Sequence, residues 1–341
     1  MCAARTRCLP AIAALLLSTL PCVGQTTLKD VLSWLPADTE SVVGENGPFA
    51  LPDFDSPPPD LRQPELPVAE LERQTRMLAV GLFGLKNGGL QKILKDRSVI
   101  LALEGSRRFR PPANLGEMRY EGCEVLVFGP AVILDRDSFL KNAANSAIRF
   151  EDVAGVRIAV FEERQEDDVW TTFVGFPRAN MVLVATDADY LRTTLKRMKS
   201  PSGPRALPDS LGEWKYVNTR APVWGLRHYQ KLGADLDPTS PFSERADFED
   251  AMATGLAFSF EPSARGKVTV HYLSGNNNAL QTLQEYLGAG EADTASLQQT
   301  QFRFRQAATG VIEASVTLSK VEITFRFLFG LMGMLGHAIY L

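Results

Sequence analysis

Hydrophobic and polar positions alternate most clearly between residues 155 and 199. Over 156–161 the β-branched residues Val156, Ile158 and Val160 alternate with the set Arg157, Ala159 and Phe161, which is the period of a half-buried strand. Residues 169–176 are rich in β-branched and aromatic side chains, and 181–185 are apolar throughout. The three runs predict an antiparallel meander of three strands.

A helix is expected directly after this meander. Leu191, Leu195 and Met198 stand at helical spacing, and Asp187 is placed to cap the first turn. The same patterns predict further elements on both sides. They are helices over 28–35, 68–83, 90–95, 138–144 and 278–287, and strands over 41–44, 98–103, 121–128, 254–260, 267–273, 301–307 and 311–318.

These elements predict an α+β fold of two units, each an antiparallel sheet with helices packed on one face. The run Ser-Pro-Ser-Gly-Pro at 200–204 marks the boundary, so the units span 25–205 and 206–341. A proline-rich connector, 47–67, lies within the first unit. The similar order of elements favours a duplication. The alternative is a single interleaved sheet in which the second unit completes the first.

The N-terminal residues have the pattern of a secretory signal peptide, assigned to 1–24. Arg5 and Arg7 precede an uncharged apolar stretch, 9–20, that is short for a membrane span. The expected location is therefore outside the cytoplasm, in the periplasm or the extracellular space. No Asn-x-Ser/Thr acceptor occurs, which favours a bacterial source.

The net charge limits the kinds of partner that are expected, and the cysteine content limits the possible disulfides. The formal charge of −4 becomes −6 without Arg5 and Arg7 (−4 minus 2), so nucleic acid is not an expected partner. Of the 4 cysteines only Cys123 follows the signal peptide, which excludes a disulfide within the mature chain. Its strand pattern predicts a buried, unreactive thiol.

Motifs for catalysis or metal binding are not evident. The 3 histidines are far apart, and no cluster of histidine and cysteine is present, so neither a metal nor a cofactor is expected. The run 107–110, with three arginines, is expected to be a solvated loop. An enzyme is therefore the less favoured interpretation.

The most distinctive stretch is 221–229, where aromatic and basic side chains lie close together. A ligand site here would use Arg227 to bind an anion, with Trp224 or Tyr229 stacking and His228 beside them. The favoured interpretation is an amphipathic segment that packs its aromatic side chains into the core.

The signal peptide, the phrase Leu-Pro-Ala-Asp-Thr at 35–39 and the stretch 224–229 together carry a resemblance. The chain resembles a loose set of uncharacterised exported bacterial proteins in which this phrase opens an α+β domain. The resemblance implies export and supplies no activity, so no functional residue is carried over from it.

Three functions follow as hypotheses. The first is an exported, non-catalytic protein that binds another protein or an envelope component. The second is a small-ligand or carbohydrate binder that uses 221–229, and the third is a hydrolase with dispersed catalytic residues. The apolar tail, 327–341, is too short to span a membrane alone and is expected to dock on its own sheet, the alternative being contact with a membrane surface.

Overall fold

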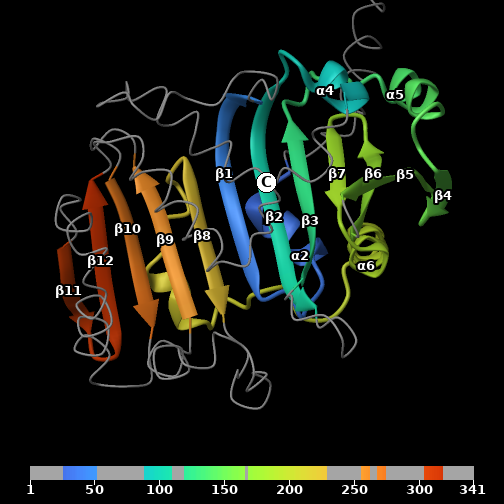
Figure 1. Ribbon diagram of the computed structural model, residues 1–341. Helices are drawn as coiled ribbons and strands as arrows, with labels where there is room; N and C mark the ends of the chain where they lie inside the picture. Colours follow the sequence, from blue (N-terminus) through green and yellow to red (C-terminus); the bar gives the residue numbers. More distant parts are fainter. Residues whose placement is uncertain are drawn as a thin grey trace, which may run out of the picture.

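The computed structural model describes residues 26–51, 88–109, 119–165, 168–228, 255–261, 267–273 and 303–317. In these residues one antiparallel sheet of 12 strands dominates (Figure 1), in the order β11-β12-β10-β9-β8-β1-β2-β3-β7-β6-β5-β4. The strands are β1 Ser41–Ala50, β2 Ser98–Phe109, β3 Arg119–Phe128, β4 Arg149–Val153, β5 Val156–Gln165, β6 Asp168–Arg178, β7 Met181–Ala185, β8 Val223–His228, β9 Gly255–Glu261, β10 Lys267–Leu273, β11 Arg303–Ala308 and β12 Val311–Thr317.

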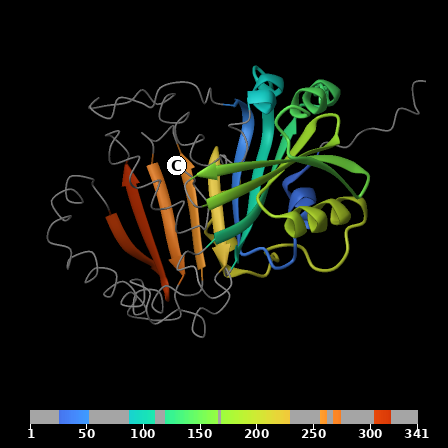
Figure 2. The same cartoon turned by 45° about the vertical axis from the view of Figure 1, so that its right-hand side comes forward.

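Short helices cover both faces of the sheet around its central strands. The helices are α2 Leu28–Trp34, α4 Gly88–Leu94, α5 Arg136–Ala143 and α6 Ala188–Lys199, with a 3-10 turn, η1, at Gly212–Lys215. Figure 2 shows α2 and α6 side by side, where they pack on one face with side chains such as Leu103 and Val125. The helices α4 and α5 pack on the other face, with Leu126 and Phe128. Alternation along β2 and β3 therefore supplies two cores, one on each face.

The predicted fold class is wrong in two respects. The described part is mostly β rather than a helix-packed α+β fold, and its helices lie on both faces. The predicted separate sheets are also joined, because β1 pairs with β2 on one side and with β8 on the other. The joined sheet corresponds to the alternative stated above, in which the second half completes the first. Residues 200–204 lie between β7 and β8 in sequence and do not interrupt the sheet.

Several local predictions are confirmed. The apolar run 181–185 is β7, the meander is β5-β6-β7, and Asp187 caps α6 by accepting a hydrogen bond from Tyr190 N at 2.7 Å. Strand β4 was not predicted, because its short charged sequence has no clear alternation. The signal peptide, most of the connector 47–67, the helices expected at 68–83 and 278–287, and the tail 327–341 lie outside the described residues.

Candidate functional site

Ionisable side chains from neighbouring strands lie at one end of the sheet. At this end β1 begins while β2 and β8 finish, because Ser41 pairs with both Ser106 and Arg227. We call this end the charged rim and define it by eight residues. They are Asp38, Glu40, Arg107, Glu121, Asp187, Glu213, Arg227 and His228.

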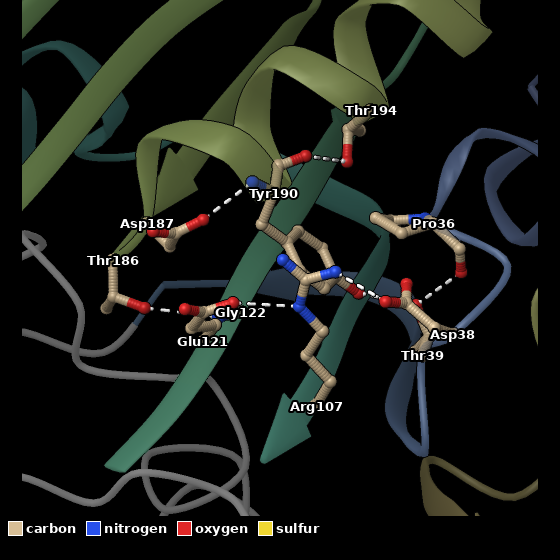
Figure 3. A network of polar contacts seen from close by, with 10 residues as sticks. All are labelled: Pro36, Asp38, Thr39, Arg107, Glu121, Gly122, Thr186, Asp187, Tyr190 and Thr194. Carbon is tan, nitrogen blue, oxygen red and sulfur yellow. Dashed lines mark hydrogen bonds and ion pairs between the residues drawn. The ribbon is translucent and has the colours of Figure 1, made fainter. Parts of the chain in front are cut away.

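Arg107 joins three separate parts of the chain at the rim (Figure 3). Its Nη1 donates to Asp38 Oδ2 at 2.6 Å, and its Nε donates to Glu121 Oε2 at 2.8 Å. The guanidinium carbon also lies 5.5 Å from the centre of the Tyr190 ring, within the range of a cation–π contact. Arg107 belongs to β2, so the prediction of a solvated loop is wrong for this residue.

The phrase at 35–39 forms the turn between α2 and β1. Thr39 donates its backbone N–H to Pro36 O at 3.1 Å and its hydroxyl to the same oxygen at 2.7 Å. The hydroxyl oxygens of Thr39 and Tyr190 are 2.8 Å apart, and Leu35 is fully buried in the core beside α2. These contacts hold the turn against the core and α6, so residues 35–39 have a structural role.

Glu121 lies in the least favourable electrostatic position of this network. Burial raises the pKa of its carboxyl, the hydrogen bond from Arg107 opposes this shift, and the charges of Asp187 and Asp189 add to it. Asp187 is held in place as the cap of α6, and Thr186 accepts a hydrogen bond from Gly122 N at 3.1 Å. Among the described residues, Arg107 is the cation that pairs with Glu121 and offsets the repulsion within this group of carboxylates.

A second polar pair stands at the end of β8. His228 Nδ1 lies 2.8 Å from Oε1 of Glu213, whose side chain is only 3% exposed, whereas the side chain of His228 is 36% exposed. Glu213 reaches this position from η1 by lying over Gly255, where a Cβ atom would stand 2.0 Å from the same Oε1. When Nδ1 carries the proton and donates it to Glu213, Nε2 is left as an acceptor.

Of the four side chains predicted for a ligand site, the three that the structure describes lie in different surroundings. Trp224 is fully buried beside Trp214 in the core that contains α2 and α6. Arg227 points to the opposite face, is 3% exposed, and has Nη2 at 3.9 Å from Glu40 Oε2. His228 remains accessible at the rim, and Tyr229 lies outside the described residues. Ligand binding by this stretch stays a prediction.

Sequence reasoning missed a row of three buried carboxylates at the centre of the sheet. Glu104 and Glu124 face each other across β2 and β3, and Glu45 of β1 lies diagonally beyond Glu104. Their exposed fractions are 1% for Glu45, 4% for Glu104 and 1% for Glu124. A signal was present in the sequence, since alternation places Glu124 on the same strand face as Leu126 and Phe128.

The described residues hold neither a metal-binding group of side chains nor a helix that could cross a membrane. No group of three histidine, cysteine, aspartate or glutamate side chains there is arranged to hold a metal ion. In the same part of the chain no helix is long and apolar enough to cross a membrane.

Comparison with known proteins adds no relative. No family model matches the chain, and no match was found among curated proteins or among solved structures. The resemblance drawn from residues 35–39 thus stays a prediction, and the charged rim is interpreted from its own geometry.

Proposed function

We propose that the protein is an exported, non-catalytic binding protein that uses the charged rim to contact another protein or an envelope component. The observation that supports this proposal is that two accessible polar groups near neighbouring strand ends are each held by a short polar contact. Asp38 has a side chain that is 58% exposed and is fixed by Arg107 at 2.6 Å. His228 is 36% exposed and is fixed by the buried Glu213 at 2.8 Å.

The two groups are close neighbours in the fold. The backbone N–H of His228 donates to the carbonyl of Glu40 at 2.8 Å, and Asp38 precedes Glu40 by two residues. Polar side chains that are ordered before binding lose little conformational entropy when a partner contacts them. The carboxylate and the imidazole together suit a partner that presents hydrogen-bond donors or basic groups.

The remaining rim contacts support a binding role over a catalytic one. Arg107 uses its Nε and Nη1 on internal carboxylates, and the hydroxyl of Tyr190 is satisfied by Thr39. These groups stabilise the strand ends and are not directed at a position where a substrate would react.

The experiment that tests this proposal is site-specific photocrosslinking in a bacterium that exports the full chain. A photoreactive residue is placed at Ala37 or Lys215, exposed positions that adjoin the rim and leave Asp38 and His228 intact. Asp152 is the control position on the distant edge strand β4, where its side chain is 65% exposed. We expect discrete crosslinked species from the two rim positions and none from position 152. Identical species from all three positions, or none from the rim, would contradict the proposal.

The geometry of His228 favours a hydrolase as a second candidate. A buried carboxylate hydrogen-bonded to Nδ1 of a histidine whose side chain is 36% exposed is the arrangement of a histidine general base. Purified full-length protein is assayed against model esters, peptides, phosphoesters and glycosides, beside His228→Gln and Glu213→Gln. Turnover by the natural chain that both substitutions abolish would replace the binding proposal, and absence of turnover would support it.

A further inference from the structure

The row of buried glutamates is an unusual feature for the centre of a β-sheet. Glu104 and Glu124 are directly opposed in the ladder between β2 and β3, where like charges are destabilising. Glu45 is added from β1, whose register sets it opposite Ala102, one diagonal step from Glu104. Three ionised carboxylates in such a position would repel one another, and each would also have lost its hydration on folding.

Glu124 is the member of the row with the poorest surroundings for a charge. It is 1% exposed, and its Oε2 has no hydrogen-bond partner among the described residues. Its partner on the adjacent strand β7 is Val184, which in turn pairs with Val174 of β6. An ionised carboxylate here would face apolar side chains on one side and Glu104 on the other.

We propose that Glu124 carries a proton in the folded protein at neutral pH, and that loss of this proton in alkaline solution loosens the pairing of β2 with β3. The neutral acid removes the repulsion at the opposed pair and lowers the cost of burial. The pairing of β2 with β3 at the centre of the sheet is then sensitive to pH.

The groups around Glu124 agree with this assignment. Burial raises the pKa of its carboxyl well above the ordinary value, and the charges of Glu104 and then Glu45 raise it further. On the same face β8 contributes Arg227, which lies beyond β1 and beside Glu40. The neighbouring Cys123 faces the opposite core, and β6 and β7 contribute valines. In the described part, no cation is set directly across from Glu124.

The sign of the pH dependence follows from linkage. The pKa of Glu124 is higher in the folded than in the unfolded chain, so the folded protein binds more protons above the ordinary carboxyl pKa of 4.5. The contribution of Glu124 to stability is fully present below that pH and is lost progressively as the pH rises toward the folded pKa. In this pH range the folded chain binds one more proton than the unfolded chain. Each pH unit of increase therefore raises the unfolding equilibrium constant by about tenfold.

The test compares the natural chain with Glu124→Gln, which keeps the shape of the neutral acid and cannot ionise. Unfolding in urea is measured from pH 5 to pH 9 for both proteins. We expect the ratio of the two unfolding constants, natural over Glu124→Gln, to rise by up to about tenfold per pH unit. Glu151→Gln, on edge strand β4, removes a carboxylate outside the row and should not reproduce this slope. A ratio that stays constant over the whole range would overturn the proposal.

A second measurement on the natural chain does not depend on any variant folding. Carbon-13 NMR of glutamate side-chain carboxyls, followed against pH, shows which of them is protonated. We expect one carboxyl that stays protonated at pH 7, and that signal should be missing from Glu124→Gln. If every glutamate carboxyl of the folded protein is ionised at pH 7, the proposal is wrong. Faster amide exchange in β2 and β3 at pH 9, after correction for intrinsic rates, would report the loosened pairing.

Discussion

Thr39 and Tyr190 are separated by 151 positions in the chain, and their hydroxyl oxygens lie 2.8 Å apart in a buried contact. Thr39 has one hydroxyl proton and donates it to Pro36 O, so Tyr190 must be the donor to Thr39. The chain of bonds Tyr190 to Thr39 to Pro36 ties helix α6 to the turn that starts the central strand β1.

This direction of donation predicts unequal effects for the two partners. Tyr190→Phe leaves the Thr39 bond to Pro36 intact and should reduce the free energy of unfolding by about 1 kcal/mol. Thr39→Val leaves the Tyr190 hydroxyl buried without a partner and also removes the Pro36 bond, so we expect a loss of about 2–4 kcal/mol. Urea unfolding measures both losses.

The double variant provides the control. In Tyr190→Phe with Thr39→Val no orphaned hydroxyl remains, so the combined loss should be smaller than the sum of the two single losses. Strict additivity would show that the hydroxyls do not interact.

Gly44 is required by the close approach of Trp224 from the neighbouring strand. A Cβ atom at Gly44 would lie 2.3 Å from Cζ2 of Trp224, whose ring is fully buried and has no room to withdraw. We expect Gly44→Ala to destabilise the protein by about 3 kcal/mol or more in urea unfolding. Gly129→Ala is the matched control, because the nearest atom to its new Cβ is a Val132 methyl at 3.9 Å. Equal losses for both variants would contradict the assigned contact.

Elements that depend on local pattern could be predicted from the sequence. Strand β7 is marked by five apolar residues, and α6 by its Asp187 cap and its apolar spacing. The pairing of β1 with β8 has no local signal, because it joins segments more than 170 residues apart whose alternation fits several partners. The number of sheets and the faces covered by helices follow from such pairings, and for this reason the fold class was mistaken.

The candidate site was predictable only in part. His228 was singled out from its neighbours, but its partner Glu213 comes from a separate turn and carries no pattern of its own. Arg107 was assigned to a solvated loop because three arginines in four residues are usually exposed. In the structure Arg107 lies in strand β2, where Asp38 and Glu121 from other parts of the chain form ion pairs with it. Contacts of this kind are set by the tertiary fold.

Cys123 is expected to be unreactive in the folded protein. Its thiol is fully buried, and burial, to which the charge of Glu104 adds, raises its pKa far above the ordinary value, so the thiolate is not populated. A chromogenic disulfide reagent should label it only after denaturation. Labelling of the native protein at the rate of the denatured protein would show that the core around β3 opens readily.

The last prediction concerns Arg107, whose two ion pairs differ in environment. The Asp38 side chain is 58% exposed and that of Glu121 is 16% exposed, so water screens the first pair more than the second. Arg107→Met keeps the apolar stem and removes the charge. It leaves Glu121 beside Asp187 without the charge of Arg107, and we expect a loss of about 2 kcal/mol near neutral pH. Asp38→Asn should cost less than about 1 kcal/mol, and 1 M salt should reduce that cost further. The loss caused by Arg107→Met should shrink in acid, because protonation of Glu121 removes the uncompensated charge. If Asp38→Asn costs as much as Arg107→Met, the exposed pair stabilises the rim, and the role assigned to Glu121 is wrong.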